Sequence, residues 1–241
     1  IDRVVYGAAS GLVLHEWFGI DSTATHTGKG APLATPLQAF ATCSSDYILQ
    51  VDSDLLVGRT DDQHDFLGEM IDALESNPQA VTISLNVPGV SESPVTDRHE
   101  EQAWRVEVRG CLLHRRRLLA ARPLPNVVEN GLPVLSWHRS IDQVVHRGDL
   151  CSLRGGSAAT WFVHPPNACK QPVADWMLHL DLVEGGHLPL RQLGKVDLVG
   201  SPLDWVPRER HEPIIFIITG RNVPPCRIRR CLHSLWAQQR S

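Results

Sequence analysis

The segment from residue 46 to residue 57 constrains the fold most, because two acids interrupt an apolar run there. Strand-forming apolar residues lead up to Asp52-Ser53-Asp54, and residues 55–57 resume the apolar run. Two carboxylates left unpaired in a core would strongly destabilise the fold. A divalent cation at the end of the strand, held by carboxylate oxygens and shared with a phosphate, removes that penalty. The ordinary alternative is that the two acids start a turn or cap a helix.

The bulk properties of the chain exclude several classes of protein. The formal net charge of −4 argues against a dedicated nucleic-acid binder. A run of about 18 apolar residues is missing, so we expect no membrane span in this segment. We expect a cytoplasmic location, at most peripheral to the inner face of a membrane. The six cysteines show no CxxC pairing, which indicates reduced thiols.

Apolar periodicity predicts helices and strands that alternate along the chain. Helices are expected at 66–74, 112–121, 138–148 and 173–183, and strands at 47–51, 80–87 and 104–109. Loops rich in proline, glycine and polar residues are expected at 88–101 and 122–135. This alternation favours an α/β fold with a mixed, mostly parallel sheet flanked by helices.

The composition changes again near the C-terminal end. Residues 207–213 are charged and linker-like, and Ile214–Ile218 then has the pattern of a buried, parallel-type strand. A helix with one apolar face follows it. We therefore expect one domain over 1–206, a linker over 207–213, and the first strand and helix of a second domain over 214–241.

Three short motifs carry a resemblance to a known family. Gly28-Lys29-Gly30-Ala31-x-Leu33, Asp46-Tyr47-Ile48-Leu49 and Asp52-Ser53-Asp54 together resemble the donor-site segment of family-2-like glycosyltransferases of GT-A fold. The resemblance implies a GT-A-type, Rossmann-like domain that lacks its first strand–helix unit, and residues 214–241 look like the start of a second such domain. Because the missing unit would hold the nucleotide base, the isolated chain is expected to bind a donor poorly.

The resemblance implies transfer of a sugar from a nucleotide donor of UDP, GDP or dTDP type to a hydroxyl of a glycan or glycoconjugate. Negative charge develops on the leaving diphosphate, and Mg²⁺ or Mn²⁺ would neutralise it. By the resemblance, Asp54 ligates the metal, and Asp52 faces the donor ribose, the metal or its waters. Lys29 is expected to help position the donor; its alternative is a solvated lysine in a Gly-flanked turn.

An inverting, hexosyltransferase-type reaction also needs a base that deprotonates the acceptor hydroxyl. The resemblance implies an acidic residue at the start of a later helix, and Asp142 is the first candidate. His138 and Glu129 are its competitors. The ordinary interpretations are an exposed helix acid for Asp142 and a helix-start histidine for His138.

His164 is the candidate for a third metal ligand, because the resemblance implies a late histidine after the strand that follows the base helix. It comes directly after the apolar Trp161–Val163, and two prolines follow it and would fix its loop. The alternative is a histidine that is hydrogen-bonded for structure alone.

Two other functions would use the same residues. A metal-dependent nucleotidyltransferase also needs carboxylates beside a nucleotide, and a degenerate GT-A module would bind a sugar or a partner protein without turnover. Separately, the basic run His114-Arg115-Arg116-Arg117 could meet phosphates, although a solvated helix face is its ordinary interpretation.

Overall fold

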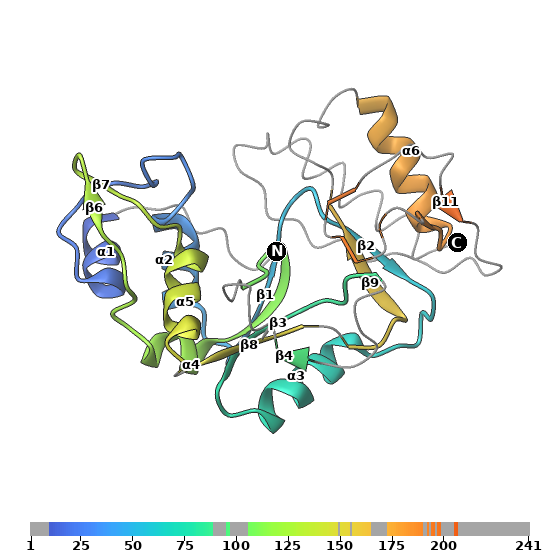
Figure 1. Cartoon of the computed structure of the whole chain (residues 1–241), viewed down its shortest axis with the longest axis horizontal. Coiled ribbons are helices and arrows are strands. Elements are labelled where there is room, and N and C mark those ends of the chain that lie inside the picture. The colour runs from blue at the N-terminus through green and yellow to red at the C-terminus, as the bar shows by residue number, and fades with distance from the viewer. Residues whose placement is uncertain are drawn as a thin grey trace.

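The computed structural model describes residues 10–88, 95–96, 106–148, 150–154, 156–164, 173–189, 192, 194–195, 197–198 and 205–206. Within these residues, helices and strands form a mixed α/β fold (Figure 1). The predicted linker over 207–213 and the predicted second domain over 214–241 lie outside the described residues.

The bounds of the elements confirm most of the predicted helices. The helices are α1 (Ser10–Phe18), α2 (Ala34–Thr42), α3 (Phe66–Ser76), α4 (Arg115–Ala120), α5 (Trp137–His146) and α6 (Val173–Glu184). The strands are β1 (Tyr47–Val51), β2 (Leu56–Arg59), β3 (Ala80–Ser84), β4 (Val95–Thr96), β5 (Gly110–His114), β6 (Val128–Glu129), β7 (Leu132–Pro133), β8 (Cys151–Arg154), β9 (Thr160–Val163), β10 (Leu188–Pro189) and β11 (Trp205–Val206). Thus α3, α5 and α6 lie where helices were predicted from the sequence.

Within the described residues, the main sheet has five strands in the order β1-β5-β3-β8-β4. In this part of the sheet β3 pairs with β8 in parallel, whereas β1 with β5, β5 with β3, and β8 with β4 pair antiparallel. The prediction of a mixed sheet flanked by helices is confirmed, but the prediction that it is mostly parallel is wrong for the described pairs. The cause is β5, which runs in the reverse direction between β1 and β3 and so converts one side of the sheet to antiparallel pairing.

Residues 110–114 are the place where the local prediction fails. The pattern predicted a half-exposed strand over 104–109 and a helix from 112, but residues 106–108 are not in a strand and the fully buried β5 comes after them. The helix, α4, begins only at Arg115. A short apolar run such as Cys111-Leu112-Leu113 is compatible with either a buried strand or a helix. It forms a strand because its backbone pairs with β1 on one side and β3 on the other.

Helices cover both faces of the main sheet. On one face, Trp17 of α1, Phe40 of α2 and Trp137 of α5 belong to one buried cluster, and the Phe40 and Trp137 rings meet edge to face at 5.1 Å. On the other face, Met70 and Leu74 of α3 belong to a second cluster. Successive residues of β5 alternate between these two clusters, as the side chains of a strand buried on both faces must.

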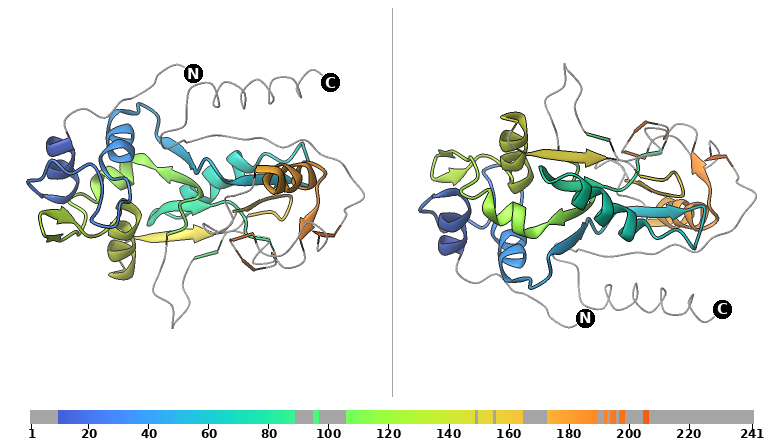
Figure 2. Two further views of the ribbon diagram at one scale, coloured as in Figure 1. Left: turned by 90° about the horizontal axis from the view of Figure 1, so that it is seen from above. Right: turned by 90° about the horizontal axis from the view of Figure 1, so that it is seen from below.

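A smaller sheet lies beside the main one and is formed by β2 and β9, which pair antiparallel. Its buried residues pack against α6 in a third cluster. Both views in Figure 2 place α1 at one end of the molecule and α6 at the other. The turn that joins β1 to β2, residues 52–55, therefore connects the main sheet to the smaller one.

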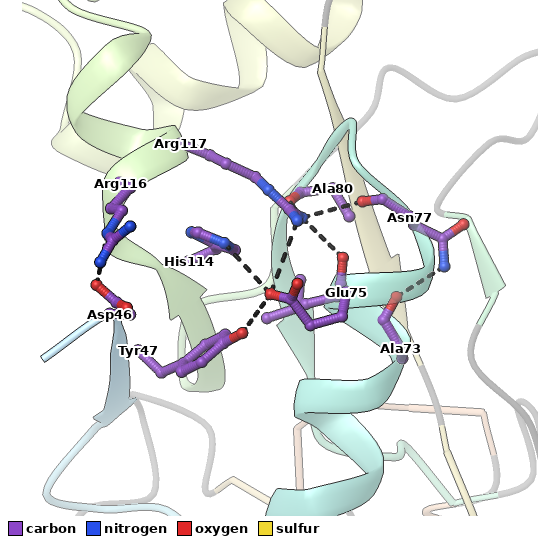
Figure 3. Close-up of polar contacts among 10 residues, drawn as sticks. Asp46, Tyr47, Ala73, Glu75, Asn77, Ala80, His114, Arg116 and Arg117 are labelled. Atoms are coloured by element: carbon purple, nitrogen blue, oxygen red, sulfur yellow. Dashed lines mark hydrogen bonds and ion pairs between the residues drawn. The ribbon is translucent and has the colours of Figure 1, made fainter.

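The basic run before and within α4 stabilises the ends of other helices. Arg115 donates to the carbonyls of Phe40 and Ala41 in the last turn of α2, at 2.8 Å each. Arg117 donates to the carbonyls of Leu74, Asn77 and Ala80 at 2.7–3.0 Å (Figure 3). The Leu74 and Asn77 carbonyls lie at the C-terminal end of α3, where not every backbone acceptor has a helical partner, and Ala80 is the first residue of β3. Arg115 and Arg117 thus serve neither as phosphate ligands nor as a solvated helix face.

Replacing Arg117 with methionine is expected to lower the free energy of unfolding by about 2–3 kcal/mol, because three carbonyls lose a charged donor. The measurement is urea unfolding followed by circular dichroism. Arg116→Met is the matched control: its side chain is 74% exposed and is paired with Asp46, so the loss should stay within about 0.5 kcal/mol. Equal losses in the two variants would contradict the capping role of Arg117.

Candidate metal centre

Asp52 and Asp54 lie in the turn directly after β1, and backbone hydrogen bonds fix that turn. The Asp52 amide donates to the Arg109 carbonyl at 2.8 Å, which extends the pairing of β1 with β5 by one residue. The Leu55 amide donates back to the Asp52 carbonyl at 3.1 Å, and the Leu55 side chain is buried. The turn is thus held by a neighbouring strand on one side and by the core on the other.

His164 reaches the same turn through the pairing of β2 with β9. In that antiparallel register Leu56 lies opposite Val163, so the next residue along β9 lies beside the turn that precedes β2. The His164 side chain is only 7% exposed, and its Nε2 lies 3.3 Å from Asp54 Oδ1. Residues far apart in sequence therefore meet because two strand pairs share one turn.

Asp52, Asp54 and His164 form the candidate metal centre. One possible ligand atom from each residue lies within 4.8 Å of those of the other two. Two carboxylates and an imidazole suit Mn²⁺ better than Mg²⁺, which prefers oxygen ligands throughout. The structure therefore brings together all three residues that were predicted from the sequence as metal ligands.

The electrostatics around Asp52 also fit a bound cation. Burial and, next, the neighbouring Asp54 carboxylate raise the pKa of Asp52 from its ordinary value of 3.8 to about 6, and His164 opposes this shift. An ionised Asp52 is thus disfavoured in the folded chain when no cation is present. A divalent ion between the carboxylates would reverse that penalty.

Asp52→Asn is expected to stabilise the metal-free protein by about 1–3 kcal/mol above pH 6. At that pH the Asp52 carboxylate is ionised although the folded structure disfavours its charged form, and the substitution removes this penalty. A raised pKa in the folded state means that stability is lost as the pH rises from about 3.8 to about 6. The difference between variant and parent should therefore vanish below about pH 4. The measurement is thermal unfolding with a chelator at several pH values. A variant no more stable than the parent at pH 7.5 would contradict the expected penalty.

Further charged residues surround the centre and were missed by the sequence analysis. Arg109 lies 3.3 Å from Asp197 and 3.8 Å from Glu107. Asp197 also lies 3.3 Å from Nδ1 of His164. Glu107 and Arg109 fell in the stretch predicted as a half-exposed strand, and the pairing of β5 with β1 brings them to this edge. Asp197 carries no local sequence signal that could have identified it.

Of the three predicted base candidates, Asp142 is buried and held by structure. Its side chain is 9% exposed; one carboxylate oxygen accepts from the Val106 amide, and the other is paired with Arg139. The alternative of an exposed helix acid is therefore wrong. A buried carboxylate must be paired or hydrogen-bonded, and both oxygens of Asp142 have such partners. Through these contacts Asp142 connects α5 to the segment before β5.

His138 and Glu129 occupy different surroundings. Burial, then Arg139, then Arg109 lower the pKa of His138 to about 4, so its imidazole is neutral at pH 7 and a weak base. Arg109 also acts to lower the pKa of Asp52, so the same arginine lies near both His138 and the candidate metal centre. Glu129 is exposed in the β6–β7 hairpin.

Lys29 lies with that hairpin. Its turn is closed by a hydrogen bond of 2.9 Å from the Gly30 amide to the Thr27 carbonyl, and Gly30 adopts a φ of +79° that favours glycine. The Gly28 amide donates to the Pro133 carbonyl of β7 at 3.0 Å. Lys29 itself is exposed. The structure thus groups Lys29 with Glu129 at the hairpin and groups Asp52, Asp54 and His164 at the end of β1.

Comparison with protein families, with curated proteins and with solved structures gives no match to this chain. None of the helices in the described part of the chain combines the length and the hydrophobicity that crossing a bilayer requires.

Proposed function

We propose that the chain carries the donor-binding centre of a metal-dependent glycosyltransferase, which moves a sugar from a nucleotide-sugar donor to a hydroxyl of a glycan or glycoconjugate. The observation that carries the proposal is the meeting of Asp52, Asp54 and His164 at the end of β1. The likeness of residues 28–54 to the donor segment of family-2-like glycosyltransferases supports the same function. Manganese is the first ion to test, because the ligand set includes an imidazole.

The chemistry that the proposal requires fits the charges at this edge of the sheet. A bound Mn²⁺ or Mg²⁺ would neutralise the charge that develops on the leaving diphosphate. Asp54, in the turn before β2, and His164, directly after β9, would hold the ion at the end of the smaller sheet, and Asp52 would complete the site or contact the ion's waters. Arg109 is paired with Glu107 and Asp197. Burial and, next, the nearby Asp54 carboxylate raise the pKa of Asp52, so carboxylates outnumber this arginine and the region favours a cation.

A second candidate is a GT-A-like module that binds the donor without transferring the sugar. The observation that favours it is the state of Asp142, whose carboxylate is buried and paired with Arg139. A base must reach the acceptor hydroxyl directly or through one water, and Asp142 could do so only after leaving both of its partners.

The test is calorimetric titration in two steps. Mn²⁺ is titrated first, because that step depends only on residues within the described chain, and UDP, GDP and dTDP are then titrated with and without Mn²⁺. Saturable Mn²⁺ binding, followed by weak but manganese-dependent binding of one nucleotide, is expected. Failure to bind Mn²⁺ would overturn the proposal.

Products separate the candidate functions. Slow hydrolysis of a sugar nucleotide supports the glycosyltransferase, and its absence with intact nucleotide binding supports the binding module. Pyrophosphate release from a nucleoside triphosphate would instead indicate a nucleotidyltransferase.

A further inference from the structure

His164 lies between two carboxylates, and only one of them belongs to the candidate metal centre. Its Nε2 is 3.3 Å from Asp54 Oδ1, and its Nδ1 is 3.3 Å from Asp197 Oδ1. The backbone supports this arrangement: His164 and Asp197 form a parallel β-bridge, and the Leu198 amide donates to the His164 carbonyl. The two sides of one imidazole thus face two different acids.

We propose that Asp197 is a positioning residue, which orients His164 so that Nε2 is presented to a metal ion. A carboxylate that accepts a hydrogen bond from Nδ1–H selects the tautomer whose Nε2 lone pair is free for a metal, and it makes the ring a stronger ligand. Because the His164 ring is 7% exposed, its orientation is set by such contacts and by packing rather than by water. This inference rests on the proposed function, since it concerns the same metal centre.

Arg109 explains how a further carboxylate can lie so near Asp52 and Asp54. Its guanidinium is 3.3 Å from Asp197 Oδ1, and its carbonyl accepts the Asp52 amide at 2.8 Å. One residue therefore holds the turn through its backbone and compensates Asp197 through its side chain. Contacts therefore link Asp52 to Arg109, Arg109 to Asp197, Asp197 to His164, and His164 to Asp54. Because Asp52 and Asp54 belong to the same turn, these contacts form a closed ring.

A purely structural role for Asp197 makes a different prediction from a positioning role. If Asp197 only attaches its segment to β9, its loss lowers stability whether or not His164 is present. If Asp197 acts through the imidazole, its effect on metal affinity depends on His164. A double-mutant cycle separates the two roles, because it isolates the coupling between two residues in contact.

The experiment measures Mn²⁺ affinity by electron paramagnetic resonance in the 241-residue chain, in Asp197→Asn, in His164→Ala and in the double variant. Asp197→Asn is expected to weaken binding by about 10–100-fold in the parent and by less than about 2-fold in the His164→Ala background. Asp181→Asn, an exposed acid of α6, is the matched control and should leave the affinity unchanged. Unfolding curves on the same samples establish that each variant is folded.

The outcomes separate this inference from the proposed function. Equal losses in the two backgrounds, or no loss in either, would overturn the role of Asp197 and leave the metal centre in place. Absence of Mn²⁺ binding by the unaltered chain would overturn both. Partial recovery of affinity in Asp197→Glu, which restores the carboxylate but not its position, would support the inference.

Discussion

Asp54→Asn is expected to weaken Mn²⁺ binding by about 100-fold. The substitution keeps the shape of the side chain but removes a charged ligand that faces His164 Nε2 at 3.3 Å. Removing one member of a buried charge pair costs about 3 kcal/mol, and that energy corresponds to about 100-fold in affinity. Manganese-dependent binding of a nucleoside diphosphate should be lost with it. The measurement is calorimetric titration of Mn²⁺, followed by the nucleotide.

Asp46→Asn is the matched control for this experiment. Asp46 lies just before the other end of β1, is 46% exposed and is paired with Arg116 (Figure 3). It carries the same charge as Asp54 and flanks the same strand at its other end, so it reports any effect of net charge alone. Its replacement should leave Mn²⁺ affinity unchanged. A parent-like affinity in Asp54→Asn would exclude Asp54 as a metal ligand.

Gly58→Ala is expected to lower the free energy of unfolding by about 3 kcal/mol. A Cβ atom at this position in β2 would lie 2.3 Å from two carbon atoms of the Trp161 ring, which is 1% exposed and lies opposite on β9. A buried aromatic ring cannot move aside as the end of a flexible side chain can, so the two strands must separate or the ring must leave its packing. Because β2 and β9 carry Asp54 and His164 at their ends, metal affinity should fall as well.

Chemical unfolding measures this effect, and Gly11→Ala provides the matched control. A Cβ atom at Gly11 of α1 would meet its nearest neighbours at 3.7 Å, an ordinary contact. Alanine is favoured over glycine within a helix, so this control should be unchanged or up to about 1 kcal/mol more stable. If Gly58→Ala unfolded within 0.5 kcal/mol of the control, roughly the noise of such comparisons, the close packing of Trp161 on β2 would be refuted.

The elements that the sequence predicted well are those with a long, regular pattern. The helices α3 and α5 each present an apolar stripe over at least two turns, and β1 ends at Val51, directly before Asp52, as expected. The prediction failed at β5 because this segment lacks such a pattern. Its five residues are all buried and show no periodicity, so whether they form a helix or a strand depends on pairing with β1 and β3. Parallel or antiparallel pairing could not be predicted for the same reason.

The candidate site divides in the same way. Asp52 and Asp54 could be identified from local sequence, because two carboxylates that interrupt an apolar run need a compensating partner, whereas His164 needed a family resemblance to be connected with them. Arg109 and Asp197 depend on the pairing of distant strands, which no local pattern encodes. Asp142 shows the limit of an argument from spacing, because its sequence position fits a base while its carboxylate is buried against Arg139.

The pairing of β2 with β9 also determines when the candidate centre can assemble. A hydrogen bond from Thr60 to the Ala159 carbonyl joins residues 99 positions apart, so a very long loop must close before this sheet exists. During synthesis from the N-terminus, both aspartates leave the ribosome well before the histidine that faces them. The complete centre of three residues therefore forms only after this pairing, and binding of an ion by all three residues reports that β2 and β9 have already met.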